Sequence, residues 1–215
     1  MNSSPAAAAK RASFKMFVKR QVRTIHWMSG AVCLVGMILF ASTGITLNHA
    51  GILSAKPKVV EGEVVLPEEM ARQLQETLED GTQLPLPKEV ARYLKSETGF
   101  DLIGRTGEWT EYDINISIAR PGGDAWVSID RETGDVLFEK TSRGVVAYLN
   151  DLHKGRNTGL AWTLFLDLFA IGVIIFSATG LWLLQMQAAR RSSTWPLTAL
   201  GFALPIILLL IFVHA

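Results

Sequence analysis

The sequence of 215 residues contains a single cysteine, Cys33, and only 19% charged residues. One cysteine excludes an internal disulfide framework and a cysteine-rich metal site. The phosphate-binding loop, the dinucleotide-binding loop and the Ser-His-Asp arrangement are all missing, and so is the H-E-x-x-H motif of zinc peptidases. These absences argue against several common enzyme classes and direct attention to the apolar segments.

Hydrophobic residues make up 49% of the chain, which leaves room for several membrane helices and one small globular domain. Three long apolar segments predict transmembrane helices at residues 25–48, 158–188 and 195–214. The polar stretch at residues 50–155 predicts a folded domain. The expected fold class is a membrane protein with three transmembrane α-helices and an α+β domain inserted between the first two.

Within the polar stretch, proline and acidic residues begin two amphipathic segments, as is typical of helix starts. These segments predict helices at residues 67–78 and 87–98. Alternating apolar residues between turn sequences predict strands at residues 109–118, 125–129 and 135–139. We therefore expect helices packed on an antiparallel meander.

Basic residues gather at two places beside the apolar segments. Six Lys and Arg residues without any acid lie between Lys10 and Arg23, and Arg190 and Arg191 lie between the last two helices. Binding of nucleic acid is the other interpretation of such a run, but a helix directly behind it favours membrane topology. The sequence therefore predicts that residues 1–24 are cytoplasmic and that residues 50–155 and the C-terminus face outward.

All four histidines lie at or near the end of an apolar segment: His26, His49, His153 and His214. His26 and His49 stand 23 positions apart, about 34 Å along a helix at ~1.5 Å per residue, so one imidazole is expected near each membrane face. Imidazole is a haem and metal ligand. The alternative is that these histidines are amphipathic interface residues with a structural role.

Asp167 is the one acid within the membrane core. An unpaired carboxylate there is costly, so we expect it to face the helix bundle. It has three interpretations: a proton relay, a hydrogen bond that orients a histidine, or a helix-packing hydrogen bond to Ser42 or Thr43.

The first two apolar segments contain a short internal repeat. Phe40-Ala-Ser-Thr-Gly-Ile-Thr-Leu47 is similar to Phe176-Ser-Ala-Thr-Gly-Leu-Trp-Leu183. The copies would run in opposite directions through the membrane, as inverted-topology repeats do.

Three stretches resemble the PepSY-associated transmembrane family. The first is the basic stretch that leads into His26, followed by Gly30, Thr43-Gly44 and His49. The second is the segment Ser128–Val136, with its D-x-x-T-G turn. The third is Leu149–Gly155, which leads into a helix with Asp167 and Thr179-Gly180. The resemblance covers about residues 17–184. It implies that residues 50–155 form a PepSY-like domain and that the protein lies in the bacterial inner membrane.

Larger members of this family, with four helices, are haem-containing reductases of ferric siderophore complexes. The resemblance therefore implies a b-haem redox protein that reduces, or helps to reduce, periplasmic ferric complexes in iron uptake. His49 and His153 are the first choice of axial ligands, and His214 is a weaker alternative. A haem at His26 would need a second chain or a different ligand, and a second haem at a homodimer interface is a further expectation.

This chain departs from those relatives because it has three expected helices and only four histidines. The alternative function is therefore a non-enzymatic one. In that case a membrane-anchored PepSY domain binds or regulates a periplasmic peptidase or another partner.

Overall fold

The computed structural model describes residues 5–53, 55–75 and 79–213. The chain forms two compact units. One unit consists of residues 1–39 and 164–215, and the other of residues 40–163. Each is described by itself below.

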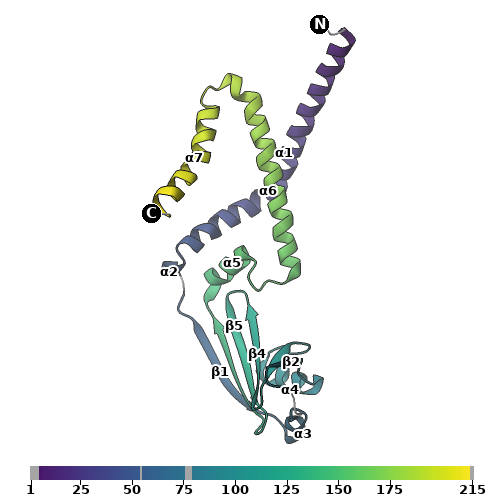
Figure 1. Ribbon diagram of the computed structural model, residues 1–215, viewed down its shortest axis with the longest axis vertical. Helices are drawn as coiled ribbons and strands as arrows, with labels where there is room; N and C mark the ends of the chain where they lie inside the picture. The colour runs from purple at the N-terminus through teal and green to yellow at the C-terminus, as the bar shows by residue number, and fades with distance from the viewer. Residues whose placement is uncertain (1–4, 54, 76–78, 214–215) are drawn as a thin grey trace. The chain divides into compact units, whose positions relative to one another are not determined.

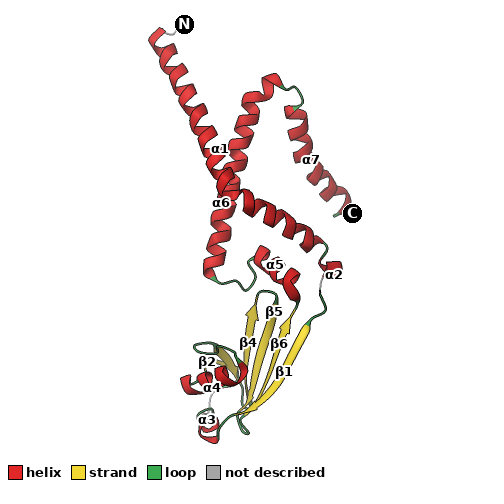
Figure 2. Cartoon of the chain, turned by 180° about the vertical axis from the view of Figure 1, so that it is seen from behind, coloured by secondary structure: helices red, strands yellow, loops and turns green. Residues whose placement is uncertain are grey.

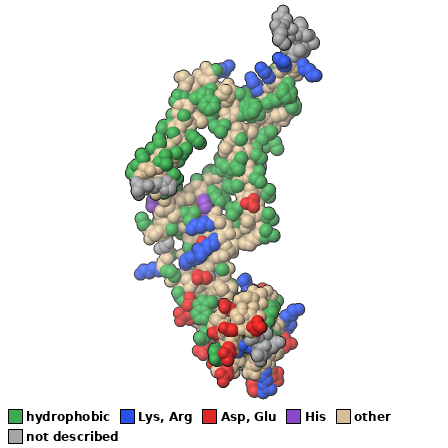
Figure 3. All heavy atoms as spheres, in the orientation of Figure 1, with side chains coloured by type: hydrophobic (Ala, Val, Ile, Leu, Met, Phe, Trp, Pro, Cys, Tyr) green, Lys and Arg blue, Asp and Glu red, His purple; other side chains and the backbone are tan. Residues whose placement is uncertain are grey.

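Three helices of the described residues are long and apolar enough to cross a membrane. They are α1 (Pro5–Asn48), α6 (Leu160–Gln187) and α7 (Thr194–Phe212), drawn in Figure 1. Hydrophobic side chains cover these helices in Figure 3, whereas acidic side chains gather on the part built from strands. The chain is a membrane protein with three candidate spans, as its hydropathy predicts.

In the first unit, glycines allow α1 and α6 to approach closely. A Cβ atom added at Gly36 would lie 2.3 Å from Cε2 of Phe169, and one added at Gly30 would lie 2.9 Å from Cε2 of Phe176. Cys33 lies between these two positions and is only 2% exposed. Small residues at such crossings let phenyl rings pack against helix backbone, which is how membrane helices associate without a hydrophobic driving force.

The second unit contains a six-stranded antiparallel sheet in the order β1-β6-β5-β4-β3-β2, shown in Figure 2. Its strands are β1 (Lys58–Val65), β2 (Thr82–Pro85), β3 (Thr106–Trp109), β4 (Asp113–Arg120), β5 (Gly123–Asp130) and β6 (Asp135–Ser142). Strands β3 to β6 form the expected meander. The edge strands β1 and β2 are additions that the sequence pattern does not predict.

The core lies between one face of the sheet and the helices α3 (Glu68–Arg72) and α4 (Lys88–Thr98). Its fully buried side chains include Leu74, Leu94, Ile114, Ile116, Val127, Ile129 and Val136. The predicted helix at 87–98 agrees with α4. The predicted helix at 67–78 is too long, because α3 ends at Arg72; residues 76–78 lie outside the described residues.

A buried arginine explains the early end of α3. Arg131 is 7% exposed, and its Nε–H donates to the carbonyl of Leu74 at 2.9 Å. Its Nη1 group also donates to the carbonyls of Thr110 and Glu111. Because Arg131 takes the Leu74 carbonyl, this part of the chain is held against the turn between β3 and β4.

The single strand expected at 109–118 is wrong, because a turn divides it. The backbone N–H of Thr110 donates to the carbonyl of Asp113 at 2.8 Å, and the N–H of Asp113 donates to Oγ1 of Thr110 at 3.0 Å. These local bonds reverse the chain between β3 and β4. Threonine and aspartate favour such turns because their side chains compete for backbone groups.

Two further helices complete the second unit. Helix α2 (Ala50–Leu53) follows α1, and α5 (Gly144–Lys154) follows β6. Figures 1 and 2 show α5 at one end of the sheet, with α3 and α4 at the other. The sequence pattern does not predict α5, although this helix carries His153. A short 3₁₀ turn, Ala188–Arg190, follows α6 in the other unit.

The hairpin between β5 and β6 is the D-x-x-T-G turn. Oδ1 of Asp130 accepts hydrogen bonds from the backbone N–H groups of Thr133 at 2.8 Å and Glu132 at 2.9 Å. The bond from Thr133 is the main reason that the pKa of Asp130 lies below its usual value. Gly134 then takes a φ of 77°, which favours glycine.

We expect this turn to lose stability in acid. Because the folded-state pKa of Asp130 is lowered, its ionised form stabilises the fold above the unfolded pKa, and this contribution disappears as the pH falls through the folded pKa. Thermal unfolding of the full chain in detergent from pH 6 to pH 3 would measure the effect. Asp130→Ala should weaken the pH dependence, and an unchanged dependence would contradict the prediction.

The crossing of α1 and α6 gives a second stability prediction. Gly36→Ile should lower the unfolding free energy by about 1–3 kcal/mol, because the new side chain meets the Phe169 ring. Gly201→Ile in α7 is the matched control, since nothing lies within 4 Å of a Cβ there. Urea titration in mixed micelles compares the two. Equal stability of both variants would show that the crossing does not require a small residue.

Candidate functional site

His153 lies near the end of α5 and contacts the last turns of α1 within the second unit. Its Nδ1 atom is 2.6 Å from Oγ1 of Thr43, and its ring packs at 45° against that of Phe40, with centroids 4.8 Å apart. A Cβ atom at Gly44 would lie 3.9 Å from the imidazole Cε1. The imidazole of His153 is thus enclosed on three sides, by Phe40, Thr43 and Gly44.

The partners of Thr43 determine where the imidazole proton sits. The Thr43 hydroxyl donates to the carbonyl of Phe40 at 3.1 Å. Its single proton is used there, so we assign the hydroxyl as acceptor of the Nδ1–H of His153. With Nδ1 protonated in the neutral ring, Nε2 carries the lone pair. Nε2 of His153 has no hydrogen-bond partner among the described residues.

His26 has an equivalent environment in the first unit. Its Nδ1 atom is 3.1 Å from both the carbonyl oxygen of Phe176 and Oγ1 of Thr179. Its ring stacks on that of Phe176 at 10°, with centroids 4.4 Å apart. A Cβ atom at Gly180 would lie 3.2 Å from the imidazole Cε1. Since a carbonyl only accepts, Nδ1 of His26 again carries the proton.

These two environments explain the internal repeat. Each copy supplies the same pattern, Phe-x-x-Thr-Gly, once as Phe40–Gly44 and once as Phe176–Gly180. In each, the phenylalanine ring contacts a histidine ring, the threonine hydroxyl accepts from Nδ1, and the glycine leaves room beside Cε1. We call this pattern the histidine seat. The two copies of the repeat are therefore similar in their side-chain contacts as well as in their sequence.

His49 has a different setting, because it is exposed and follows directly after α1. Its Nδ1–H donates to the carbonyl of Ile45 at 3.0 Å, on its own helix. It stands six positions after Thr43, about 240° round the helix axis, so it lies on another side of α1 from the His153 seat. Among the described residues, no hydrogen bond or ring contact joins His49 to His153. Their pairing at one haem stays a prediction.

The remaining predicted site residues are less constrained. His214 lies outside the described residues. Asp167 is exposed on α6 and has no ion pair among the described residues. Ser42 and Thr43 belong to the other unit, so the expected contact with Asp167 stays a prediction. In the described part of the chain no three His, Cys, Asp or Glu residues gather as a metal site.

A second hydrogen bond fixes α5 to α1 beside the first. The hydroxyl of Thr46 donates to Oδ1 of Asn150 at 2.6 Å, and Asn150 is only 6% exposed. Sequence reasoning missed Asn150, Thr46 and the role of Thr43 as partner of His153. The Thr-Gly step of each repeat copy was visible in the sequence and indicated a shared role. The sequence did not indicate which distant residue each threonine would contact.

The sequence profile of the PepSY_TM-like family matches residues 17–214. The chain belongs to the PepSY-associated transmembrane family. Both histidine seats lie within the matched residues, so they are part of the region that this PepSY-associated protein shares with its family. No curated protein and no solved structure matches the chain.

The histidine seats predict a definite tautomer. We expect ¹⁵N spectra of the full chain in detergent near neutral pH to show His26, His49 and His153 protonated at Nδ1, because each Nδ1 faces an acceptor oxygen. Thr43→Val removes the acceptor of His153 and should alter only that residue's ¹⁵N signals, with a stability loss of about 1 kcal/mol.

Thr198→Val is the matched control, since that hydroxyl donates only to Thr194 on its own helix. It should leave all three tautomers unchanged. Protonation of His153 at Nε2 in the unaltered protein would show that the assigned direction of the Thr43 hydrogen bond is wrong.

Proposed function

We propose that this PepSY-associated protein is a haem-binding membrane protein of the bacterial inner membrane that takes part in electron transfer. The observation that carries the proposal is shared by His26, His49 and His153. Each has Nδ1 bonded to an oxygen acceptor, and none has a partner for Nε2 among the described residues. Haem-ligating imidazoles have this arrangement, because the outer hydrogen bond fixes the ring and raises the basicity of the ligating nitrogen.

The residues present fit a b-type haem in their donor chemistry. Haem iron accepts neutral imidazole, and the hydrogen bonds to Thr43 and Ile45 leave His153 and His49 with Nε2 as the available donor. The glycine of the histidine seat keeps one side of the His153 ring free of a side chain. His153 and His49 would hold the iron, with His214 as a weaker alternative. Bound haem supplies reversible one-electron chemistry.

The chain's own residues would hold the ligand in a fixed orientation. The 2.6 Å bond from His153 to Thr43 and the Phe40 ring restrict rotation of the imidazole about its own axis. The bond from Thr46 to Asn150 keeps α5 against α1, so the position of His153 does not depend on one contact. A rigid ligand costs little reorganisation when the charge of a bound group changes.

The proposal also covers the orientation of the protein in the membrane and the substrate. The basic residues before α1, together with Arg190 and Arg191, favour a cytoplasmic N-terminus, with the sheet and the C-terminus in the periplasm. The substrate would then be a periplasmic ferric siderophore complex in iron uptake. A homodimer that brings two copies of His26 together would complete a second haem site on the cytoplasmic side.

Visible spectroscopy tests the haem proposal. Detergent-purified full chain should show a Soret band that sharpens and shifts on reduction with dithionite, and haem assay should give its stoichiometry. His153→Ala and His49→Ala should each abolish the bound haem of this site, since a six-coordinate haem needs both imidazoles. Thr43→Val should weaken haem retention about tenfold or more through loss of orientation.

Thr198→Val again serves as the control and should bind haem as the unaltered protein does. A colourless protein after expression with excess haem would overturn the haem proposal. Full haem retention in both histidine variants would overturn the choice of ligands while leaving a haem protein.

A second candidate function is partner binding by the sheet. Trp126 and Leu137 lie on the face away from α4 and are 41% and 50% exposed, although both are large and apolar. An exposed aromatic residue on an open sheet face suits a protein partner such as a periplasmic peptidase. A colourless protein whose peptidase complex is lost in Trp126→Ala, but kept in Tyr112→Ala, would favour this function.

A further inference from the structure

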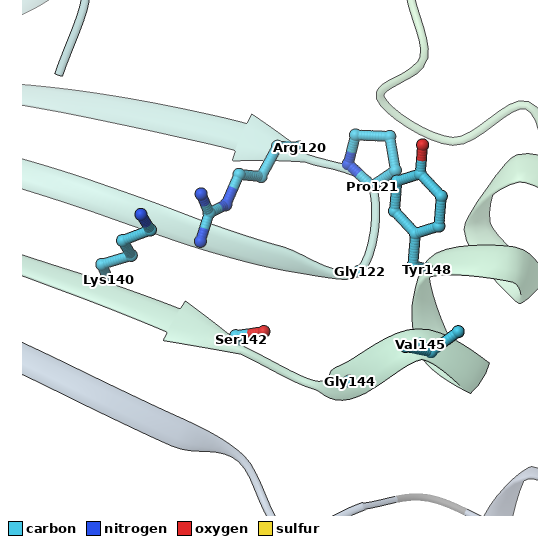
Figure 4. Close-up of a pocket in the computed structure, with 8 residues that line it drawn as sticks. All are labelled: Arg120, Pro121, Gly122, Lys140, Ser142, Gly144, Val145 and Tyr148. Carbon is cyan, nitrogen blue, oxygen red and sulfur yellow. The ribbon is translucent and has the colours of Figure 1, made fainter. Parts of the chain in front are cut away.

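A cavity of about 540 Å³ lies in the second unit, where the sheet meets α5. Its lining residues are Arg120, Pro121, Gly122, Lys140, Ser142, Gly144, Val145 and Tyr148. The strand ends of β4 and β6 form one side, the β4–β5 turn forms another, and the first turns of α5 close the end (Figure 4). This size lies within the range of small-ligand sites. The histidine seats do not include any of these residues.

The cavity lining carries positive charge, and the nearby carboxylate of Asp151, bonded to Gly122, is paired with Arg143. Arg120 and Lys140 line the cavity, and no Asp or Glu is among its lining residues. The Arg120 guanidinium has one long bond, to the carbonyl of Thr141 at 3.4 Å, and Lys140 has no ion pair among the described residues. Figure 4 shows both side chains directed into the same space. Two like charges held together are stabilised by an anion between them.

The register of the sheet explains why the strand residues on the cavity side include no Asp or Glu. Lys140 pairs with Ala125 across β5, so the neighbouring acids Asp124 and Glu139 fall on the opposite face. The same face as Lys140 continues into the apolar core further along the strands, where α4 covers it. Its uncovered end is therefore cationic, and the covered part is apolar.

An ion pair between buried Asp151 and half-buried Arg143 makes the wall of the cavity rigid. Asp151 is 5% exposed, and its Oδ2 atom accepts from the Gly122 N–H at 2.9 Å and from Nη2 of Arg143 at 3.2 Å. The Arg143 N–H donates in turn to the Gly122 carbonyl at 2.8 Å. The β4–β5 turn is thus fixed to α5. A Cβ on Gly122 would lie 2.7 Å from Cβ of Tyr148, so the two cavity walls are in direct contact.

The cavity lies beside the end of a candidate membrane span. Helix α5 is bonded to α1 through Thr46 and Asn150, and the candidate span of α1 ends at Asn48. Val145 and Tyr148, on the same helix, line the cavity and are 73% and 45% exposed. Apolar and tyrosine side chains at this level are typical of a membrane interface.

We propose that this cavity binds the phosphate group of an anionic ligand, either the headgroup of a membrane lipid or free phosphate. Arginine matches two phosphate oxygens with its planar fork, and lysine adds a second point charge. The hydroxyl group of Ser142 is an additional donor in the lining. The proposal is independent of haem, because it uses neither histidine seat.

Equilibrium binding to the full chain in uncharged detergent tests this site with three probes: inorganic phosphate, dioctanoyl phosphatidylglycerol and dioctanoylglycerol, which lacks phosphate. The double variant Arg120→Gln/Lys140→Gln should weaken binding of a phosphate-bearing probe tenfold or more, since charge-assisted hydrogen bonds are lost. Lys88→Gln/Arg92→Gln is the control. It removes the same charges from exposed positions of α4 and should bind as the unaltered chain does.

Tenfold loss with phosphatidylglycerol alone assigns a lipid headgroup, and the same loss with inorganic phosphate as well assigns a general phosphate site. The proposal is overturned if neither probe binds, if dioctanoylglycerol binds as tightly as phosphatidylglycerol, or if the pocket variant and the control variant bind equally. Thermal unfolding without ligand confirms that both double variants fold. Haem content has no bearing on this readout.

Discussion

The hydrogen bonds from His153 to Thr43 and from Thr46 to Asn150 join α5 to the last turns of α1, and the placement of α5 in the second unit depends on this junction. The buried residues of α5 are both polar: Asn150, which bonds to Thr46, and Asp151, which bonds to Gly122. Polar pairing therefore places α5, with little help from apolar burial. Because unpaired polar groups are costly in such surroundings, each of these contacts requires the others to be satisfied.

Helix α5 therefore forms hydrogen bonds with two neighbouring elements, α1 and the β4–β5 turn. On one side Asn150 and His153 bond to α1, and on the other Asp151 holds the turn between β4 and β5. Removing Asp151 would leave the Arg143 guanidinium, whose Nε already lacks a partner among the described atoms, without its ion pair. The orientation of the imidazole and the shape of the phosphate cavity thus depend on one short helix.

The sequence predicts what local patterns determine. Continuous apolar runs predict the three candidate spans, a proline followed by acidic residues predicts the start of α4, and Asp130 followed by Thr133 and Gly134 predicts the hairpin. It does not predict what distant pairing determines. Strand β1 exists because it pairs with β6, 70 to 84 positions away. The helix α5 has apolar residues at helical spacing, Val145, Leu149 and Leu152, but its buried residues are polar, so the position of α5 could not be inferred from apolar packing.

The histidine seats show the same limit at the candidate site. Thr43 and His153 are 110 positions apart, and His26 and Thr179 are 153 apart, so no local rule connects them. The repeat Phe-x-x-Thr-Gly was visible in the sequence as a similarity of two helices. The role of the repeat became clear only from the structure, because each threonine contacts a histidine that lies on a different helix.

The equivalence of the two seats also bears on how many haems the protein would hold. The chemistry that orients His153 orients His26 equally well, through Thr179 and the Phe176 carbonyl. If this orientation serves a ligand in one unit, the same reasoning applies to the other. Yet the first unit has only His26 among its described residues, and a six-coordinate haem needs two imidazoles. A haem at His26 therefore requires a second chain or a different second ligand. Association between copies would thus determine whether a second haem of the proposed kind could bind at His26.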